Sequence, residues 1–226
     1  MPVSQQHSPT LRDCVYGQAV GDALGVPYEF RARGTFECTG MAGHGSHNQP
    51  AGTWSDDTSM ALATCDSIRA TDRGRAGERD NGNGSLMRIL PLAFNDATDD
   101  EVRAVSAITH AHAISCEACV RMMHVARRLI AGKGPRDVAG SLVGVPASQI
   151  RSGGFVLDTE RGALWCLANT SSYAECVLAA VNLGDDTDTT AAVAGGLAGI
   201  AYGTGGIPGK WLDALLGKTA IDACLS

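Results

Sequence analysis

The chain has 226 residues, enough for one domain with a substantial core, and a formal net charge of -6 at pH 7. Hydrophobic residues make up 44% of it and charged residues 19%, the balance of an ordinary globular protein. The negative charge, without a basic run or interleaved basic and aromatic residues, argues against a nucleic-acid partner. No apolar run reaches the roughly 20 residues that a membrane-spanning helix needs, so we expect no membrane partner.

Eight cysteines are scattered along the chain, and no apolar segment with a cleavage site begins it. This pattern predicts reduced thiols in a cytoplasmic protein. Cys116 and Cys119 form a CxxC pair, but no second pair follows at zinc-ligand spacing. We therefore interpret both as packing thiols of a helix.

Helical periodicity runs along the chain, whereas no sustained alternation of β-branched residues predicts a strand. Neither an internal repeat nor a low-complexity linker marks a domain boundary. The prediction is a single all-α domain of many short helices. In chain order, the expected helices are 10–23, 58–70, 85–94, 99–109, 113–131, 135–142, 159–169, 172–183, 189–202 and 210–216.

Residues suited to N-capping precede several of these helices, namely Asp57 or Thr58, Asp99, Ser172 and Thr189. Residues 72–80 are polar and charged, which is typical of an exposed connector. The sequence is also rich in glycine, with 28 residues, while aromatic residues are sparse at 5%. We expect small residues to mediate close packing and glycine-rich loops to bring backbone near a ligand.

Three carboxylates lie within four residues at positions 185–188, directly ahead of a helix rich in small residues. Like charges this close raise one another's pKa unless a cation screens them. The Asp186-Thr187-Asp188-Thr189 spacing supplies the hard oxygen ligands that Mg²⁺ or Mn²⁺ prefers.

A second acidic motif, Ser55-Asp56-Asp57-Thr58, repeats this chemistry at the start of an expected helix. Either motif alone is also explained by helix capping, because Asp, Ser and Thr favour helix starts and the helix dipole favours negative charge there. Two such motifs, each with more acids than a cap needs, favour a site for divalent metal.

Six blocks, in order along most of the chain, together resemble the ADP-ribosylglycohydrolases, a family that includes the dinitrogenase reductase-activating glycohydrolase and ADP-ribosylarginine hydrolases. The resemblance implies an all-α domain that cleaves an ADP-ribose glycosidic bond. The blocks are residues 21–30 (GDALGVPYEF), 54–58 (WSDDT), 82–88 (GNGSLMR), 109–110 (TH), 153–156 (GGFV) and 184–189 (GDDTDT).

The family's acidic blocks bind two Mg²⁺ ions, and Mn²⁺ is possible at such a site. By position, the resemblance implies six ligands in this chain. Asp185 is left out, because it replaces a frequent glycine. The implied ligands are Ser55, Asp56, Asp57, Asp186, Asp188 and Thr189.

Two acids are candidates for proton transfer. Glu29 matches a family glutamate implicated in catalysis, although beside Arg31 and Arg33 it also reads as a surface acid. Asp80 resembles an acid of the nitrogenase-regulating branch, although it also suits an exposed loop. The sequence does not choose between the two.

Two glycine-rich loops and a histidine are the expected substrate-binding groups. In the first loop, residues 82–85, backbone amides at a helix start would form a phosphate cradle. In the family, the second loop, residues 153–155 here, carries an aromatic residue, usually tyrosine, that covers the nucleotide. Phenylalanine keeps the stacking face and loses the hydroxyl. The histidine follows a threonine as in the family, with His112 as its nearby rival. The predicted groups are Gly82, Asn83, Gly84, Ser85, His110, Gly153, Gly154 and Phe155.

The resemblance covers residues 1–226 with one departure: the stretch between residues 58 and 81 is shorter than in relatives. That stretch helps wall the substrate cleft, so its loss bears on substrate choice. We expect a monomeric hydrolase that releases ADP-ribose from a protein arginine. The alternatives are a serine-linked or small ADP-ribosyl substrate, a silent ADP-ribose-binding protein, or a metallo-phosphoesterase, which the absence of histidines near the acids disfavours.

Overall fold

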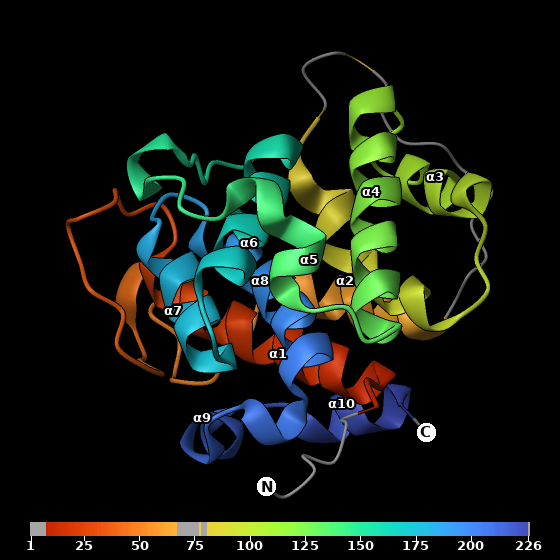
Figure 1. Ribbon diagram of the computed structural model, residues 1–226. Coiled ribbons are helices and arrows are strands. Elements are labelled where there is room, and N and C mark those ends of the chain that lie inside the picture. The colour runs from red at the N-terminus through yellow and green to blue at the C-terminus, as the bar shows by residue number, and fades with distance from the viewer. Residues whose placement is uncertain (1–7, 67–76, 78–80, 226) are drawn as a thin grey trace, which may run out of the picture.

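The structure is a computed structural model that describes residues 8–66, 77 and 81–225, and within them the regular structure is helical (Figure 1). These residues contain no β-strand, only three isolated bridges between loops. The α-helices are α1 (Leu11–Gly25), α2 (Asp56–Asp66), α3 (Asp99–Ala107), α4 (Ala113–Ile130), α5 (Pro135–Ala139), α6 (Val156–Asn169), α7 (Tyr173–Asn182), α8 (Thr187–Tyr202), α9 (Gly209–Ala214) and α10 (Lys218–Cys224).

The predicted all-α architecture is therefore confirmed, with differences at particular elements. The expected helix 85–94 is two consecutive 3-10 helices, η3 (Asn83–Arg88) and η4 (Leu90–Phe94). Pro91 lies in the first turn of η4, where its missing N–H and fixed φ are tolerated but do not continue an α-helix. Helix α10, which follows a left-handed glycine, was not expected at all.

The expected caps are right in one place and wrong in three. Ser172 caps α7 by accepting from the Glu175 amide, as expected. Helix α3 is capped by Thr98 in a capping box rather than by Asp99, because the Thr98 hydroxyl reaches the Glu101 amide. Helices α2 and α8 begin earlier than expected, at Asp56 and Thr187, so neither begins with the expected cap residue.

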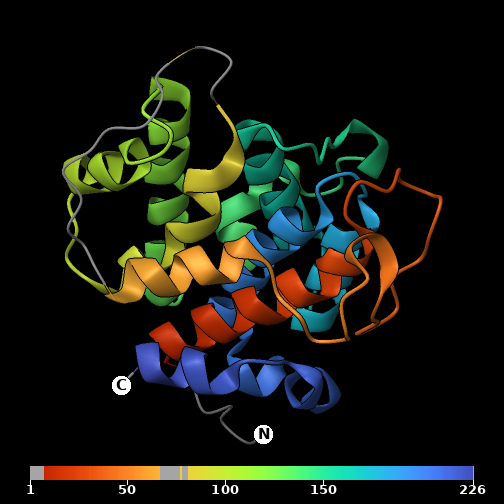
Figure 2. The same ribbon diagram turned by 180° about the vertical axis from the view of Figure 1, so that it is seen from behind.

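Helices α1 and α8 cross at the centre of the molecule, with the other helices around them (Figures 1 and 2). Their contact is close because glycines of α1 face the α8 backbone. A Cβ atom at Gly21 would lie 2.1 Å from the Ala191 carbonyl oxygen, and one at Gly25 would lie 2.3 Å from Asp188 Cα. Only hydrogen fits at such positions, which confirms the expectation that small residues mediate packing.

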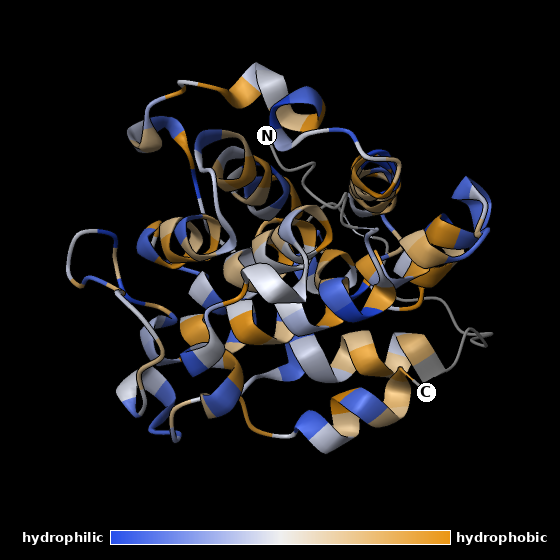
Figure 3. Cartoon of the chain, turned by 60° about the horizontal axis from the view of Figure 1, so that its bottom comes forward, coloured by the Kyte–Doolittle hydropathy of each residue, from blue (hydrophilic) through white to orange (hydrophobic). Residues whose placement is uncertain are grey.

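This crossing is antiparallel, so the end of α1 meets the start of α8. The hydrophobic core surrounds the crossing and includes the fully buried Leu24, Met122 and Leu197. Hydrophilic residues gather on the outer loops in Figure 3. The arrangement brings the loop after α1 beside the acidic motif that opens α8.

Six of the eight cysteines are buried, and none of these six forms a disulfide bond. Cys116 and Cys119 lie buried on α4, as expected of packing thiols. No helix in the described ranges has both the length and the apolar character needed to cross a membrane.

Candidate active site

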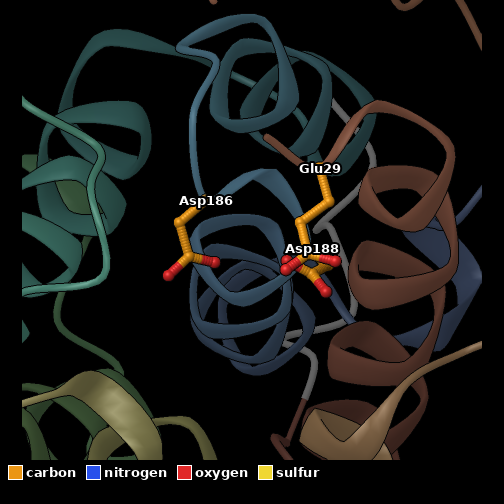
Figure 4. Close-up of side chains that lie close together, drawn as sticks. All are labelled: Glu29, Asp186 and Asp188. Carbon is orange, nitrogen blue, oxygen red and sulfur yellow. The ribbon is translucent and has the colours of Figure 1, made fainter. Parts of the chain in front are cut away.

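Carboxylates from two ends of the chain meet where α1 and α8 meet. Glu29 follows the 3-10 helix η1 (Val26–Tyr28), and Asp186 and Asp188 lie at the start of α8. One carboxylate oxygen from each of these three residues lies within 4.8 Å of the other two (Figure 4). Three carboxylates this close repel one another unless a proton or a cation compensates their charge.

Paired backbone hydrogen bonds hold the Glu29 loop against the loop before α8. The Phe30 amide donates to the Asp185 carbonyl (2.7 Å), and the Asp185 amide donates to the Arg31 carbonyl (2.8 Å). Phe30 and Asp185 both have positive φ, 64° and 60°, which is strained for side chains larger than glycine. The fold therefore accepts strain at the two residues next to the cluster.

Arg33 fastens the same loop from its other side. Its guanidinium donates to the carbonyls of Leu183, Ala147 and Ile150, each at 2.6 Å. The Arg33 guanidinium thus hydrogen-bonds to backbone carbonyls rather than to Glu29. The interpretation of Glu29 as a surface acid beside this arginine does not describe its position.

The second acidic motif is joined to α1 by Asp22, which is fully buried. The Asp22 carboxylate accepts hydrogen bonds from the Ser55 amide (2.9 Å), the Thr58 amide (3.0 Å) and the Thr58 hydroxyl (2.6 Å). A residue of α1 thereby satisfies amides at the start of α2 that a local cap would otherwise satisfy.

Asp57 connects the start of α2 with the start of α8. Its Oδ2 accepts hydrogen bonds from the Ser55 hydroxyl (3.2 Å) and the Thr189 hydroxyl (3.3 Å). Among the described residues, no donor reaches the buried Oδ1 of Asp57 or the buried Oδ1 of Asp186. Two buried carboxylate oxygens of the same cluster thus have no hydrogen-bond partner in the part of the chain that the structure describes.

The electrostatics of the cluster disfavour its charged state. Burial, followed by the nearby Glu29 and Asp186 charges, raises the pKa of Asp188 to about 9. Burial and the charges of Asp22 and Asp188 raise the pKa of Asp57 well above its usual range. Burial raises the pKa of Asp22 to about 6. A bound cation would remove this penalty, because opposite charge favours the ionised carboxylates.

A cavity of about 450 Å³ opens beside the cluster, lined by Glu29, Asp56 and Asp188 among others. Asp56 is exposed to this cavity and Ser55 is partly exposed. The structure thus brings all six expected ligands to one place: Ser55, Asp56 and Asp57 at the start of α2, and Asp186, Asp188 and Thr189 at the start of α8.

The first glycine-rich loop adjoins the acidic cluster through Asn83. Its side-chain amide donates to Asp186 Oδ2 (2.7 Å) and to the Thr159 hydroxyl (2.9 Å). The loop is partly exposed at Gly82 and Gly84, where added Cβ atoms would meet the His110 ring at 3.1 and 2.8 Å. The loop and His110 therefore form one surface beside the cluster.

Two details of this loop differ from the expected phosphate cradle. The backbone amide of Asn83 donates to the Gly154 carbonyl (3.1 Å), so this N–H does not face a ligand. The Ser85 side chain is fully buried, and its hydroxyl contacts the Cys119 thiol (3.5 Å). Ser85 therefore packs in the core, where its side chain cannot contact substrate.

The second glycine-rich loop lies against the first. Gly82 and Phe155 form an isolated bridge, and a Cβ atom at Gly154 would lie 3.2 Å from Asp186 Oδ2. Phe155 is 41% exposed. A second cavity, of about 610 Å³, is lined by Gly153, Phe155 and Asp185 among others. Phe155 thus offers an aromatic face beside the cluster.

The remaining candidates are His112 and Asp80. His112 caps α4, where its Nδ1 accepts from the Ile114 amide (3.2 Å), whereas His110 lies against the first glycine-rich loop. Asp80 lies outside the described residues, as does most of the expected connector 72–80.

Comparison with known proteins identifies the family of the chain. The family model for ADP-ribosylglycohydrolase matches residues 5–80 and 68–226. The chain belongs to the ADP-ribosylglycohydrolase family. A solved structure titled "ADP-ribosylglycohydrolase-related protein complex" superposes with a TM-score of 0.84 at 30% identity, over 95% of this chain and 94% of that one. The family resemblance and the fold type are thereby confirmed.

Two curated relatives of this glycohydrolase are enzymes by name. An ADP-ribosylarginine hydrolase of Pseudomonas putida is 30% identical over 92% of this chain and 75% of its own length. An ADP-ribosyl-[dinitrogen reductase] glycohydrolase of Rhodospirillum rubrum is 31% identical over 88% of this chain and 87% of its own length.

Two residues of this glycohydrolase site were not among the expected ones. Asp22 lies within the motif of residues 21–30, and its signal was a carboxylate in the otherwise apolar helix stretch 19–24. His47 hydrogen-bonds through Nε2 to Glu29 Oε2. It lies in the glycine-rich segment of residues 40–52, where no sequence pattern relates it to Glu29, 18 positions earlier.

Proposed function

We propose that this glycohydrolase removes ADP-ribose from modified proteins, and that the bond it cleaves joins ADP-ribose to arginine. The support for ADP-ribose is the family, together with two glycine-rich loops, His110 and an exposed aromatic ring around one acidic cluster. The support for arginine is that relatives from two species are named ADP-ribosylarginine hydrolases.

We further propose that the cluster holds two Mg²⁺ ions, for which Mn²⁺ can substitute. The observation that supports this most strongly is the pair of buried, unpartnered carboxylate oxygens, Asp57 Oδ1 and Asp186 Oδ1, since buried polar atoms without a partner are rare. The ligands would be Ser55, Asp56, Asp57, Asp186, Asp188 and Thr189, all hard oxygen donors. When bound, such ions orient ribose hydroxyls and acidify a water.

In this proposal Glu29 transfers the proton of the reaction. Its carboxylate lies at the edge of the cavity beside Asp188, and its side chain is 17% exposed, so both water and substrate can reach it. A carboxylate there can take a proton from the attacking water and return it to the leaving guanidine. Asp80 remains the alternative for this role.

Other residues position the substrate. The Asn83 side chain fixes the first glycine-rich loop to Asp186, so a ligand held by the loop is placed against the acidic cluster. His110 lies across that loop, and the Phe155 ring offers a stacking face at the second cavity. Orientation of this kind raises the effective concentration of the reacting groups.

Release of ADP-ribose from arginine-, serine- and glutamate-linked conjugates, with Mg²⁺ or with EDTA, tests the proposal. We expect release from the arginine conjugate with Mg²⁺ and none with EDTA. Release from the serine conjugate alone would make this a serine-linkage hydrolase, and AMP or phosphate as product would indicate a phosphoesterase. Binding of ADP-ribose without release from any conjugate would indicate a silent binding protein.

Asp186→Ala and Asp56→Ala should lose Mg²⁺ affinity and turnover, the latter by more than about 100-fold, because each removes a proposed ligand. Asp96→Ala is the matched control: Asp96 is an exposed aspartate at the surface, outside the cluster. Turnover like that of the unmodified protein in Asp186→Ala would contradict the ligand assignment.

A further inference from the structure

His47, at the end of the 3-10 helix η2 (Gly45–His47), contacts the carboxylate to which we assign proton transfer. Its Nε2 hydrogen-bonds to Oε2 of Glu29. An ionised carboxylate can only accept, so the imidazole Nε2–H is the donor. His47 thereby occupies one carboxylate oxygen of Glu29, and Oε1 is left for the reaction.

Helix η2 also packs against the backbone just ahead of Glu29. A Cβ atom at Gly45 would lie 2.0 Å from the Pro27 carbonyl oxygen, so only glycine allows the two backbones to lie this close. The Ser46 hydroxyl donates to the Glu29 carbonyl (2.6 Å). The three residues of η2 thus hold both the backbone and the side chain of Glu29.

The residues on either side of η2 have an unusual backbone. The φ angle is 68° at His44 and 51° at Asn48, and neither residue is glycine. His44 Nδ1 lies 3.0 Å from Asn48 Oδ1, and His44 forms an isolated bridge with Gln49, so the segment closes on itself. Backbone strain of this kind persists where the surrounding structure fixes the conformation, which here fixes the position of His47.

The contact between His47 and Glu29 lies at the cavity of about 450 Å³, which both residues line together with Asp56 and Asp188. The side chain of His47 is 42% exposed and that of Glu29 is 17% exposed. The imidazole therefore contributes to shielding the carboxylate from solvent. It also meets the Phe30 ring edge-on, with the ring centroids 6.0 Å apart.

We propose that His47 is a positioning residue for the reaction: its Nε2–H holds Oε2 of Glu29, so that Oε1 is the oxygen that takes the proton from the attacking water. The same Oε1 then returns that proton to the leaving nitrogen, and His47 keeps its own proton throughout. This inference rests on the proposed function and on the role of Glu29 within it.

The kcat and KM for ADP-ribose release from an arginine-linked protein conjugate, with Mg²⁺ present, test this role. His47→Leu removes the donor, so kcat should fall roughly 5- to 20-fold while KM stays within about twofold, because a misplaced carboxylate slows the chemical step more than it weakens binding. His47→Gln should restore most of kcat, because its side-chain amide keeps an N–H donor near the position of Nε2.

His124→Leu is the matched control. His124 makes the same kind of contact with a carboxylate, that of Asp99 at 3.0 Å, on the exposed side of α4 outside the acidic cluster. This substitution should leave both kinetic constants unchanged. Thermal unfolding of each variant checks that it is folded.

A double-mutant cycle with Glu29→Gln separates positioning from a general effect on the fold. If His47 acts through Glu29, His47→Leu should cause less than about a twofold further loss of turnover in the Glu29→Gln protein, because no proton-transfer carboxylate is left to misplace. Single turnover with excess protein measures the slow variants. Additive losses in the cycle would show that His47 acts independently of Glu29 and would overturn the inference.

Three other results would overturn this inference alone, beside an active unmodified protein. They are an unchanged kcat in His47→Leu, an equal loss in His47→Leu and His47→Gln, and an unchanged kcat in Glu29→Gln. If the unmodified protein releases ADP-ribose from no conjugate, the proposed function fails and the inference fails with it.

Discussion

Asp57 is the residue at which burial and charge conflict most in this molecule. Its side chain is 2% exposed, one of its oxygens has no donor among the described residues, and burial and the neighbouring acids raise its pKa well above its usual range. A residue that destabilises the ligand-free fold in this way is expected where a cation binds.

Asp57→Asn should therefore have opposite effects with and without metal. In EDTA the amide removes the cost of burying or protonating this carboxyl group, so we expect stabilisation by about 1 kcal/mol or more, or about 2–4 °C in Tm for each kcal/mol. With Mg²⁺ the variant should lose the stabilisation that the unmodified protein gains. Thermal unfolding of both proteins in both buffers measures this. A lower Tm in EDTA alone would show that the carboxylate is structural.

The raised pKa values also predict how stability depends on pH. The folded-state pKa is about 6 for Asp22 and about 9 for Asp188, against an ordinary value of 3.8, so the folded protein binds more protons than the unfolded one between these values. Metal-free stability should then fall as pH rises from about 5 to about 9, and Mg²⁺ should restore it most at the alkaline end. Tm measured in EDTA and in Mg²⁺ at pH 5.5 and 8.5 tests this; a metal-free Tm that rises with pH would contradict it.

At the scale of elements, the site depends on the α1–α8 crossing. Gly25 allows the end of α1 to lie against Asp188, and Asp22 on the same helix holds the start of α2. Three elements thus place their acids within one cluster. The sequence predicted the cap at Ser172 and the small residues of α8. It did not predict the consecutive 3-10 helices η3 and η4, because α and 3-10 periodicities are similar over short stretches.

Gly25→Ala should separate this crossing where it supports the site. The new Cβ would lie 2.3 Å from Asp188 Cα, so backbone must move, and we expect destabilisation of about 1–3 kcal/mol with weakened Mg²⁺ binding. Gly140→Ala is the matched control, because Gly140 has φ -61° and open space around its Cα. Equal effects of the two substitutions on Tm would show that the close contact is unimportant.

At the scale of the whole molecule, segments far apart in the sequence, such as those of Glu29 and Asp188, converge on one cluster beside two cavities. The acidic motifs alone predicted metal, and the family resemblance supplied their pairing, since two short motifs carry no information about their distance in space. Asp22 could have been found as a carboxylate in an apolar helix stretch, although its partners at the start of α2 could not, and His47 could not be foreseen because no sequence pattern relates it to Glu29. Ser85 was assigned from its motif, although its side chain faces the core.

The length of the chain between residues 58 and 81 bears on substrate choice. We propose that this stretch is shortened relative to the family; the two matches to the family model overlap at residues 68–80, which supports a break there. A shorter wall would leave the cleft open to a bulky protein substrate. Turnover of a modified protein should then exceed that of a small ADP-ribosyl-guanidine, a comparison that requires only the two kcat/KM values.

Calorimetric titration of Mg²⁺ into the metal-free protein tests most directly whether the acidic cluster binds two divalent cations, with Asp186→Ala titrated alongside. We predict two ions per chain in the unmodified protein and weakened binding in the variant. Absence of Mg²⁺ binding, together with ADP-ribose release that EDTA does not affect, would contradict the claim.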